Sequence, residues 1–432
     1  MSPKYDDAMK WSQSIDIEHS SSSYEESYLQ NISAYHEHIE SQYQRSELGK
    51  YHAKIDSVTL TSDSIMTILR VIGHGGFGEV LLVKIDGLSF PCVFKKMLHV
   101  ADEVVVKRCR KEFEVQLKLF NNAKCFNRIP RPLYILDLLD EDYRGTYGFL
   151  MEFCVGGSVK AFSQKWCADG KYLRGEEEED DDDFESSDDD SPYFYPKTLN
   201  PVKIASLCVG MIECLDDVFT AKPKLVHRDI KPDNFLIRID PKDGECTVVL
   251  GDLGLVKIQE SMSLSTSCVV SPSDSKPKKH DPDKPAHFCG TYSYLSYESL
   301  MYGEQSQLSD GFSLGMSILS LFICKHPLMD HACLIQIPMK KKMERIKMQA
   351  NIIQNGLFSG LTRVDLFKML KTIDDGKYEP VYSCLSEVFT GLIQWNSDNR
   401  MTVHSAREKI RSIKHLLPKI GEGWEYPSVE GV

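Results

Sequence analysis

The chain has 432 residues, of which 42% are hydrophobic and 26% are charged, so most of it can bury a globular core. Its formal net charge is −12, yet residues 176–190 alone hold twelve of the 63 acidic residues and no basic residue. The 51 acidic residues that remain equal the 51 Lys and Arg residues, which argues against a broad basic surface for nucleic acid or an anionic membrane.

The sequence also lacks the features expected of a secreted or membrane-spanning protein. Residues 1–20 are polar and have no apolar core of the kind found in a secretory signal. The longest apolar-rich run, residues 312–324, is too short to span a bilayer. The thirteen cysteines include no CxxC pair, so neither a disulfide framework nor a zinc site is predicted. We therefore expect a reducing compartment, cytoplasmic or nuclear, and no membrane span.

The first half of the chain is predicted to be rich in β-strands after a polar extension. Residues 1–55 contain few aliphatic side chains and are predicted to form a mobile extension. Runs of β-branched, aliphatic and aromatic residues between Gly-containing turns then predict strands, and apolar residues at helical spacing predict one helix. The strands are expected at residues 65–72, 80–85, 90–94, 133–138 and 147–153, and the helix at residues 103–120.

The second half is predicted to be helical, with two segments that lack any period. Helices are expected at residues 202–219, 307–324, 364–372, 381–394 and 404–417. The acidic tract at residues 176–190 is predicted to be a solvated insertion, and residues 256–287, rich in Ser and Pro, a long mobile loop. The prediction is an α+β fold in which a small β-rich lobe precedes a larger helical lobe. One domain would span residues 65–415, followed by a tail at 416–432.

A glycine cluster at residues 73–78 is the first candidate ligand site. Alone it is weak evidence, because glycine clusters also mark ordinary turns. A dinucleotide fold needs a helix directly after the glycines and a Walker A loop needs GK[ST], but here strand-like residues follow. A glycine turn between two strands lets backbone N–H groups lie over phosphates. The ATP-binding residues expected from this turn are Ile72, Gly73, Gly75, Gly76, Phe77, Gly78 and Val80.

Lys95 is the candidate for contacting the phosphates, twenty-two residues after Gly73. Alternate residues of a strand share a face, so Val93 and Lys95 are expected to point together into the nucleotide site, whereas Lys96 points away. An apolar side chain against the purine and an ammonium against the phosphates are the pair that ATP requires. A lone strand lysine is more often a solvated surface residue, and the position after the glycine turn argues against that alternative.

Such a lysine needs a carboxylate partner to hold it in place. Glu112 and Glu114 both lie on the predicted helix that follows. We prefer Glu112, because Val115 and Leu119 share its face of the helix and suit inward packing. Glu114 would then be a surface charge.

The strongest signal is the run HRDIKPDN at residues 227–234. Its Asp229 can accept the proton of an attacking hydroxyl, and Lys231 can neutralise charge on a transferring phosphoryl group. Asn234 supplies an amide oxygen for a metal ion, and Asp252, at the end of an apolar strand, supplies a carboxylate. Oxygen ligands of this kind suit Mg²⁺. Two Asp-rich polar turns could arise by chance, but the occurrence of both in this order argues against it.

With these motifs the sequence resembles the eukaryotic protein kinase superfamily over residues 65–415. The resemblance implies a two-lobed protein kinase fold that binds ATP and Mg²⁺ between its lobes. Lys231 together with Gly290 and Thr291 is similar to the pattern of serine/threonine kinases rather than tyrosine kinases, which implies protein substrates with Ser or Thr acceptors. Residues 227–235 also resemble the casein kinase I group, but Glu298 departs from it, so the subgroup stays open.

The resemblance also implies roles for residues outside these motifs. Glu152 and Cys154 would form a hinge whose backbone binds adenine, directly after a gatekeeper at Met151. Two further implied features are an ion pair between Glu298 and Arg400 and a buried Asp310 that anchors the catalytic loop. Three residues depart from the family pattern, none of them a group that handles phosphate, metal or proton: Leu253, Tyr297 and Gln116.

The function predicted is that of an active serine/threonine protein kinase. A catalytically impaired kinase-fold scaffold and a small-molecule kinase are the alternatives, but Lys95, Asp229 and Asp252 are all present, which argues against the first. Arg228 precedes the catalytic aspartate and leads to the hypothesis that it binds a phosphate on a serine of residues 256–287. Thr291 is the poorer candidate for that phosphate, because its hydroxyl is expected near Asp229 and Lys231.

Overall fold

The structure is a computed structural model, and it describes part of the chain. The described residues are 66–74, 78–85, 91–98, 103–139, 145–163, 201–221, 224–239, 245–258, 289–322, 328, 334, 336–338, 341–355 and 377–420. Several predictions fall outside these residues. They concern the extension at 1–55, the acidic tract at 176–190, the helix at 364–372 and most of the loop at 256–287.

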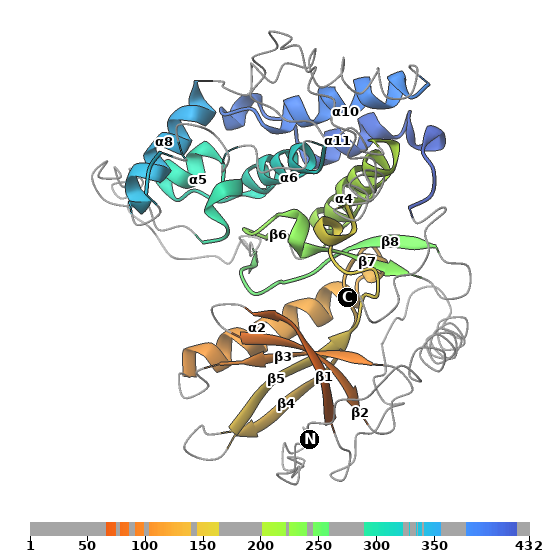
Figure 1. Cartoon of the computed structure of the whole chain (residues 1–432), viewed down its shortest axis with the longest axis vertical. Coiled ribbons are helices and arrows are strands. Elements are labelled where there is room, and N and C mark those ends of the chain that lie inside the picture. Colours follow the sequence, from red (N-terminus) through yellow and green to blue (C-terminus); the bar gives the residue numbers. More distant parts are fainter. Residues whose placement is uncertain are drawn as a thin grey trace, which may run out of the picture.

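The described elements form two lobes of different secondary structure (Figure 1). The smaller lobe contains β1 (Met66–His74), β2 (Gly78–Ile85), β3 (Cys92–Met97), α2 (Glu103–Phe120), η1 (Phe126–Arg128), β4 (Pro132–Leu139) and β5 (Gly145–Glu152). The larger lobe contains α4 (Pro201–Thr220), β6 (Leu225–Val226), η2 (Pro232–Asn234), β7 (Phe235–Ile239), β8 (Cys246–Leu250), β9 (Lys257–Ile258), η3 (Tyr292–Tyr294), α5 (Tyr297–Tyr302), α6 (Gln307–Phe322), α8 (Lys342–Gln354), α10 (Glu379–Leu392), η5 (Ser397–Asn399), α11 (Val403–Ile410) and η6 (Lys414–Leu416). The predicted two-lobed α+β architecture is confirmed.

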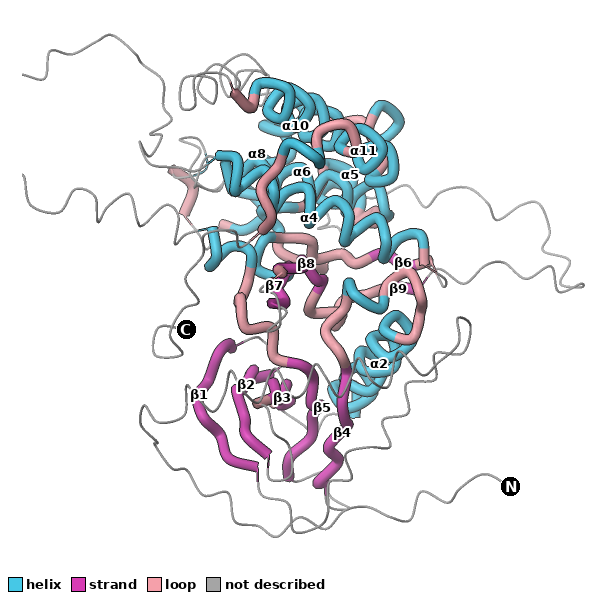
Figure 2. The backbone as a smooth tube through the Cα atoms, turned by 90° about the vertical axis from the view of Figure 1, so that its right-hand side faces the viewer, coloured by secondary structure: helices cyan, strands magenta, loops and turns pink. Residues whose placement is uncertain are grey.

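The sheet of the smaller lobe has the strand order β1-β2-β3-β5-β4, and each neighbouring pair is antiparallel. Phe94 and Leu150 pack in one apolar cluster, whereas Phe149 packs edge-on against Phe113 of α2 in another. Successive side chains of a strand face opposite sides of the sheet. Lys95, the residue after Phe94, therefore lies on the opposite face from Phe94, and this is the face that α2 covers. Figure 2 shows α2 lying beside the sheet.

The predicted elements that lie within the described residues are all present, and two of them differ from their predicted bounds by three residues or more. β3 begins at Cys92 rather than at residue 90 and runs to Met97. It follows Pro91, which has no backbone N–H to donate to a neighbouring strand. α11 ends at Ile410 rather than continuing to Leu417. The chain there forms a turn and a short 3-10 helix before Pro418, and a residue that precedes proline disfavours the helical conformation.

The larger lobe is built around α6, which is buried along almost its whole length. Its apolar side chains join one core with those of α4, α10 and α11. A helix that is hydrophobic all round belongs in the centre of a lobe, and α6 lies among the other helices in both views (Figures 1 and 2). α6 therefore lies at the centre of the core of the larger lobe.

Two short sheets connect this helical core to the site. β6 pairs with β9 and β7 pairs with β8, both antiparallel. The run at residues 227–234 leaves β6 and enters β7, and residues 251–256 join β8 to β9. The sheets therefore place both predicted polar turns side by side.

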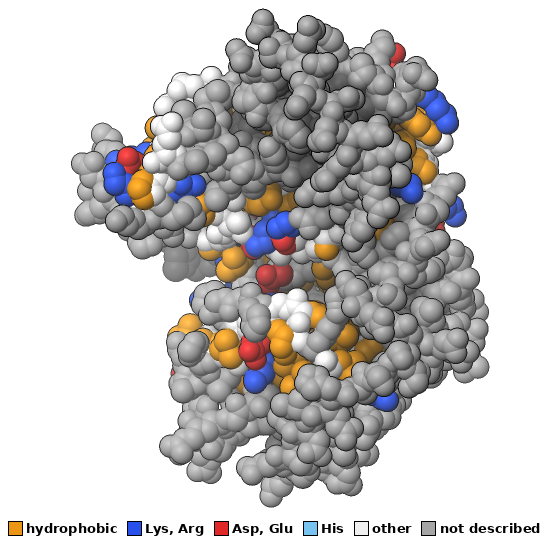
Figure 3. All heavy atoms as spheres, viewed as in Figure 1, with side chains coloured by type: hydrophobic (Ala, Val, Ile, Leu, Met, Phe, Trp, Pro, Cys, Tyr) orange, Lys and Arg blue, Asp and Glu red, His pale blue; other side chains and the backbone are white. Residues whose placement is uncertain are grey.

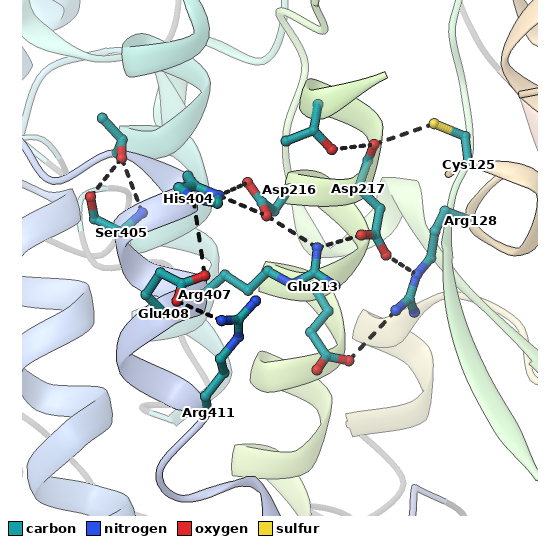
Figure 4. Close-up of polar contacts among 12 residues, drawn as sticks. Cys125, Arg128, Glu213, Asp216, Asp217, His404, Ser405, Arg407, Glu408 and Arg411 are labelled. Atoms are coloured by element: carbon teal, nitrogen blue, oxygen red, sulfur yellow. Dashed lines mark hydrogen bonds and ion pairs between the residues drawn. The ribbon is translucent and has the colours of Figure 1, made fainter. Parts of the chain in front are cut away.

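A network of charged groups joins η1, which follows α2, to the larger lobe (Figure 4). Arg128, in the connection from α2 to β4, donates from Nε to Oδ2 of Asp217 on α4 at 2.8 Å. Arg407 of α11 pairs with Asp217 and with Asp216, whose carboxylate also lies 3.3 Å from Nδ1 of His404. η1 is thereby fixed to α4, and α4 to α11.

The packed chain continues past residue 415, the predicted end of the domain. Ser206 of α4 donates a hydrogen bond to the carbonyl of Pro418 at 2.9 Å, and Ile420 packs against the apolar core. In the part of the chain that the structure describes, no helix is long and apolar enough to cross a membrane.

Candidate active site

Asp229 lies at the centre of the candidate site, between β6 and η2. Its side chain is 9% exposed, and its Oδ2 lies 3.0 Å from Nζ of Lys231. Asn234 donates from Nδ2 to the backbone oxygen of Asp229 at 2.7 Å and to Oδ2 at 3.0 Å. The three predicted catalytic residues are therefore in direct contact, and their spacing is set by one turn of η2.

Asp310, at the start of α6, anchors this loop. Its carboxylate accepts the backbone N–H groups of His227 at 2.6 Å and of Arg228 at 2.8 Å. Burial raises the pKa of Asp310 to about 7, against the effect of these two donors. Arg228 has a φ of +71°, a conformation that non-glycine residues adopt only when the surroundings impose it. The anchoring role implied for Asp310 thus has a geometric basis.

Thr291 closes the site from the segment that follows residues 256–287. Its backbone N–H and its hydroxyl each donate to Oδ1 of Asp229 at 2.7 Å, and Lys231 donates to Oγ1 of Thr291 at 2.8 Å. Burial raises the pKa of Asp229, but Lys231 and the two Thr291 donors outweigh it, so the pKa lies below its ordinary value. Asp229 is therefore ionised at neutral pH.

Gly290 makes this approach possible. Its φ is +101°, and a Cβ atom at this position would lie 2.1 Å from the carbonyl oxygen of Arg228. Any other residue would collide with the catalytic loop. Glycine at position 290 is therefore explained by sterics, whereas threonine at position 291 is explained by its hydrogen bonds.

Lys95 joins the two lobes at the site. Its Nζ lies 2.6 Å from Oε1 of Glu112 on α2 and 2.9 Å from Oδ1 of Asp252 after β8. Of the two candidate partners, Glu112 makes the contact and Glu114 is exposed. Lys96 points the other way and pairs with Glu79 at 3.7 Å, as the alternation of the strand predicts. Charged side chains gather where the two lobes meet (Figure 3).

Asp252 and Asn234 supply the oxygens that a magnesium ion would need. The backbone N–H of Gly251 donates to the carbonyl of Asn234 at 2.8 Å, so the two turns are adjacent. Partial desolvation raises the pKa of Asp252, but the ammonium of Lys95 outweighs it and lowers the pKa to about 2. The amide nitrogen of Asn234 is committed to Asp229, which leaves its oxygen to face a cation. A carboxylate and an amide oxygen fit Mg²⁺.

The structure describes most of the residues predicted to contact ATP, and these residues lie beside this site. Val80 and Lys95 are paired across β2 and β3, and Val93 is paired with Met151 across β3 and β5. A Cβ at Gly78 would lie 2.5 Å from the carbonyl of Lys96, so only glycine permits this strand pairing. Ile72 is 38% exposed at the end of β1, and Gly73 pairs with Val80. Gly75, Gly76 and Phe77 lie outside the described residues.

The side chain of Glu152 has a role that the sequence did not indicate. Its carboxylate is paired with Arg238 of β7 through two contacts, Nε to Oε1 at 2.6 Å and Nη2 to Oε2 at 2.7 Å. The N–H of Arg131 donates to the same carboxylate at 2.9 Å. Cys154, two residues further on, is buried at 4% exposure. The predicted hinge is therefore tied to the larger lobe by a side-chain ion pair. The only signal in the sequence was an arginine within the apolar strand β7.

The departures from the family pattern are accommodated by the surrounding residues. Gln116 is 3% exposed and donates from its amide to the carbonyl of Pro130 at 2.9 Å, so its polarity is satisfied. Leu253 is buried in the apolar core. Tyr297 packs edge-on against Trp395 at 5.6 Å between ring centroids.

The implied ion pair next to Tyr297 is present. Arg400, whose side chain is 0% exposed, contacts Glu298 through Nη1 at 2.6 Å and Nη2 at 3.0 Å.

Comparison with known proteins gives a family match over most of the chain. The family model described as protein kinase domain matches residues 66–410. The chain is 30% identical over 224 residues to a probable serine/threonine-protein kinase of Dictyostelium discoideum, covering 48% of this chain and 44% of that protein. It is 22% identical over 253 residues to a mitogen-activated protein kinase kinase of Nicotiana tabacum, covering 58% and 52%.

A third relative is a putative cysteine-rich receptor-like protein kinase of Arabidopsis thaliana. It is 24% identical over 283 residues, covering 64% of this chain and 34% of that protein. The chain thus spans between 34% and 52% of the length of these three relatives.

Proposed function

Because the chain belongs to the protein kinase family, we propose that it is an active serine/threonine protein kinase that transfers the γ-phosphate of ATP to protein hydroxyls. The observation that carries this proposal is the contact of Asp229 with both Lys231 and Thr291. The proposed base, a cation and the proposed acceptor-side turn thus lie around one point, which supports the proposal. A catalytically impaired scaffold has no such support, since Lys95, Asp229, Asn234 and Asp252 are all present and in contact with partners.

The acceptor side of the reaction would be handled by Asp229 and Lys231. The ionised carboxylate of Asp229 accepts the hydrogen of a Ser or Thr hydroxyl and orients its oxygen toward the phosphate. Lys231, 3.0 Å from that carboxylate, provides a positive charge that can neutralise charge on the transferring phosphoryl group. Thr291 holds both groups through its hydroxyl and sets the edge of the surface on which a peptide would lie.

The nucleotide side would be handled by Lys95 and the glycine turn. Lys95 is held by Glu112 and carries its charge toward the phosphates, and backbone N–H groups of the turn cover them. A magnesium ion held by Asp252 and Asn234 would neutralise phosphate charge and fix the phosphate geometry. We further propose a cytoplasmic or nuclear location, supported by cysteine usage without a disulfide framework.

A transfer assay tests this function directly. The full chain is incubated with γ-labelled ATP, MgCl₂ and dephosphorylated casein, and labelled protein is hydrolysed for phosphoamino acid analysis. Label on phosphoserine or phosphothreonine supports the proposal. Label confined to phosphotyrosine would contradict the acceptor class. No transfer above a reaction without enzyme would contradict the activity itself.

A further inference from the structure

The turn that carries Thr291 is bonded to α8 as well as to the catalytic loop. Gln349 of α8 donates from Nε2 to the carbonyl oxygen of Tyr292 at 2.8 Å. The same carbonyl accepts the N–H of Leu295 at 3.2 Å, which closes η3. The peptide group after Tyr292 is therefore held by α8, while Thr291 itself is held by Asp229.

The side chain of Gln349 is committed to this one contact. It is 0% exposed, and its Oε1 has no hydrogen-bond partner among the residues that the structure describes. A buried amide without a partner for one of its atoms is destabilising, so a role in folding alone is a weak reason for a glutamine here. Its single hydrogen bond goes to the acceptor-side turn.

α8 is itself fixed at its other end, so it can hold the turn in place. Arg345, one helical turn before Gln349, is 5% exposed and donates from Nη1 to the carbonyls of Leu334 and Ile337, both at 2.6 Å. Side chains four residues apart share a face of a helix, so both polar groups lie on the buried side of α8. The helix therefore presents Gln349 to Tyr292 from a defined position.

We propose that Gln349 is a positioning residue for phosphoryl transfer, acting through Tyr292 and Thr291 on the acceptor side of the site. The proposal rests on the protein kinase function proposed above. Gln349 contacts neither Asp229 nor Lys95, so it acts on the docking of the acceptor and not on the nucleotide. Loss of its hydrogen bond removes the contact between α8 and the Tyr292 carbonyl and loosens the turn that places Thr291.

The test replaces Gln349 by methionine, which has nearly the same volume but no donor. The matched control is Gln354→Met, at an exposed position of the same helix. Steady-state kinetics on the full chain with dephosphorylated casein should show kcat/KM for casein lowered roughly three- to tenfold by Gln349→Met. The KM for ATP should change less than twofold in both variants. Equal loss on both substrates, or no loss for casein, would overturn the proposal.

If the Gln349→Met variant does not fold, a measurement on the wild-type chain still tests the contact. The side-chain amide hydrogens of Gln349, assigned by NMR, should exchange slowly with solvent, whereas those of Gln354 should exchange rapidly. Rapid exchange at Gln349 would overturn the contact. This readout does not depend on activity. A wild-type chain without kinase activity would contradict the proposed function, whereas the exchange rate alone decides whether the Gln349 contact exists.

Discussion

Lys231 and Thr291, sixty positions apart in the sequence, share a hydrogen bond of 2.8 Å from Nζ to Oγ1. Both also contact the Asp229 carboxylate, Lys231 at Oδ2 and Thr291 at Oδ1. The three side chains form a closed ring in which the cation, the hydroxyl and the carboxylate fix one another. The catalytic loop and the acceptor-side turn are thereby joined as one unit.

The ring predicts different outcomes for two substitutions of Thr291. Thr291→Val keeps the shape but removes the hydroxyl, and kcat for a peptide acceptor should fall by roughly ten- to a hundredfold, because hydrogen bonds to two charged groups are lost. Thr291→Ser keeps the hydroxyl and should stay within about fivefold of wild type. Steady-state kinetics on purified variants decide, and equal activity of Val and Ser variants would show that the hydroxyl plays no part.

The two adjacent lysines of β3 should differ sharply. Lys95→Ala removes the cation that Glu112 and Asp252 hold, and kcat/KM should fall by about a hundredfold or more. Lys96→Ala removes a partly exposed pair with Glu79 and should have little effect. The measurement is kcat/KM with ATP as the varied substrate, and comparable losses in both variants would contradict the face assignment.

The role of Asp252 predicts a change in metal requirement. Asp252→Asn keeps an oxygen but loses the charge, and the magnesium concentration for half-maximal activity should rise by about tenfold or more. Activity titrated with MgCl₂ at saturating ATP measures this. The control is Asp233→Asn, because Asp233 lies in the run at residues 227–234 but is exposed and pairs with Lys160. An unchanged magnesium midpoint in Asp252→Asn would exclude it as a ligand.

The Glu152–Arg238 pair predicts a loss of stability rather than of chemistry. Both side chains are mostly buried, at 11% and 15% exposure, so removal of one partner leaves a charge without its counterion. Glu152→Gln and Arg238→Met should each lower the free energy of unfolding by about 3 kcal/mol. The double variant should lose less than the sum of the two, measured by urea unfolding of the full chain. If the loss of unfolding free energy in the double variant equalled the sum of the two single losses, Glu152 and Arg238 would have no energetic coupling.

The positions of the residues that we propose to handle phosphate, metal and proton could be predicted because these residues occur in short motifs. Asp229, Lys231 and Asn234 lie within six positions, so one turn fixes their relation. The choice of Lys95 over Lys96 followed from the alternation of side chains along a strand. Both inferences need only local backbone geometry.

The contacts of Glu152 and Gln349 could not be predicted in this way. Arg238 is 86 positions from Glu152, and Gln349 is 57 positions from Tyr292. Such pairs depend on how whole elements pack, and no local pattern encodes them. The helix α11 was predicted too long for a related reason, because the apolar spacing of its sequence continues beyond Ile410 while the backbone does not.

The central claim is that Asp229 acts on the acceptor hydroxyl while ATP is bound by other groups. The most direct test compares wild type with Asp229→Asn in two measurements on the same preparations, phosphoryl transfer to casein and binding of ATP with Mg²⁺ by calorimetry. Transfer should fall by about 10²–10⁴-fold, while the Kd for ATP should remain within about threefold. Wild-type turnover in Asp229→Asn would contradict the claim, and so would a loss of transfer explained wholly by lost ATP binding.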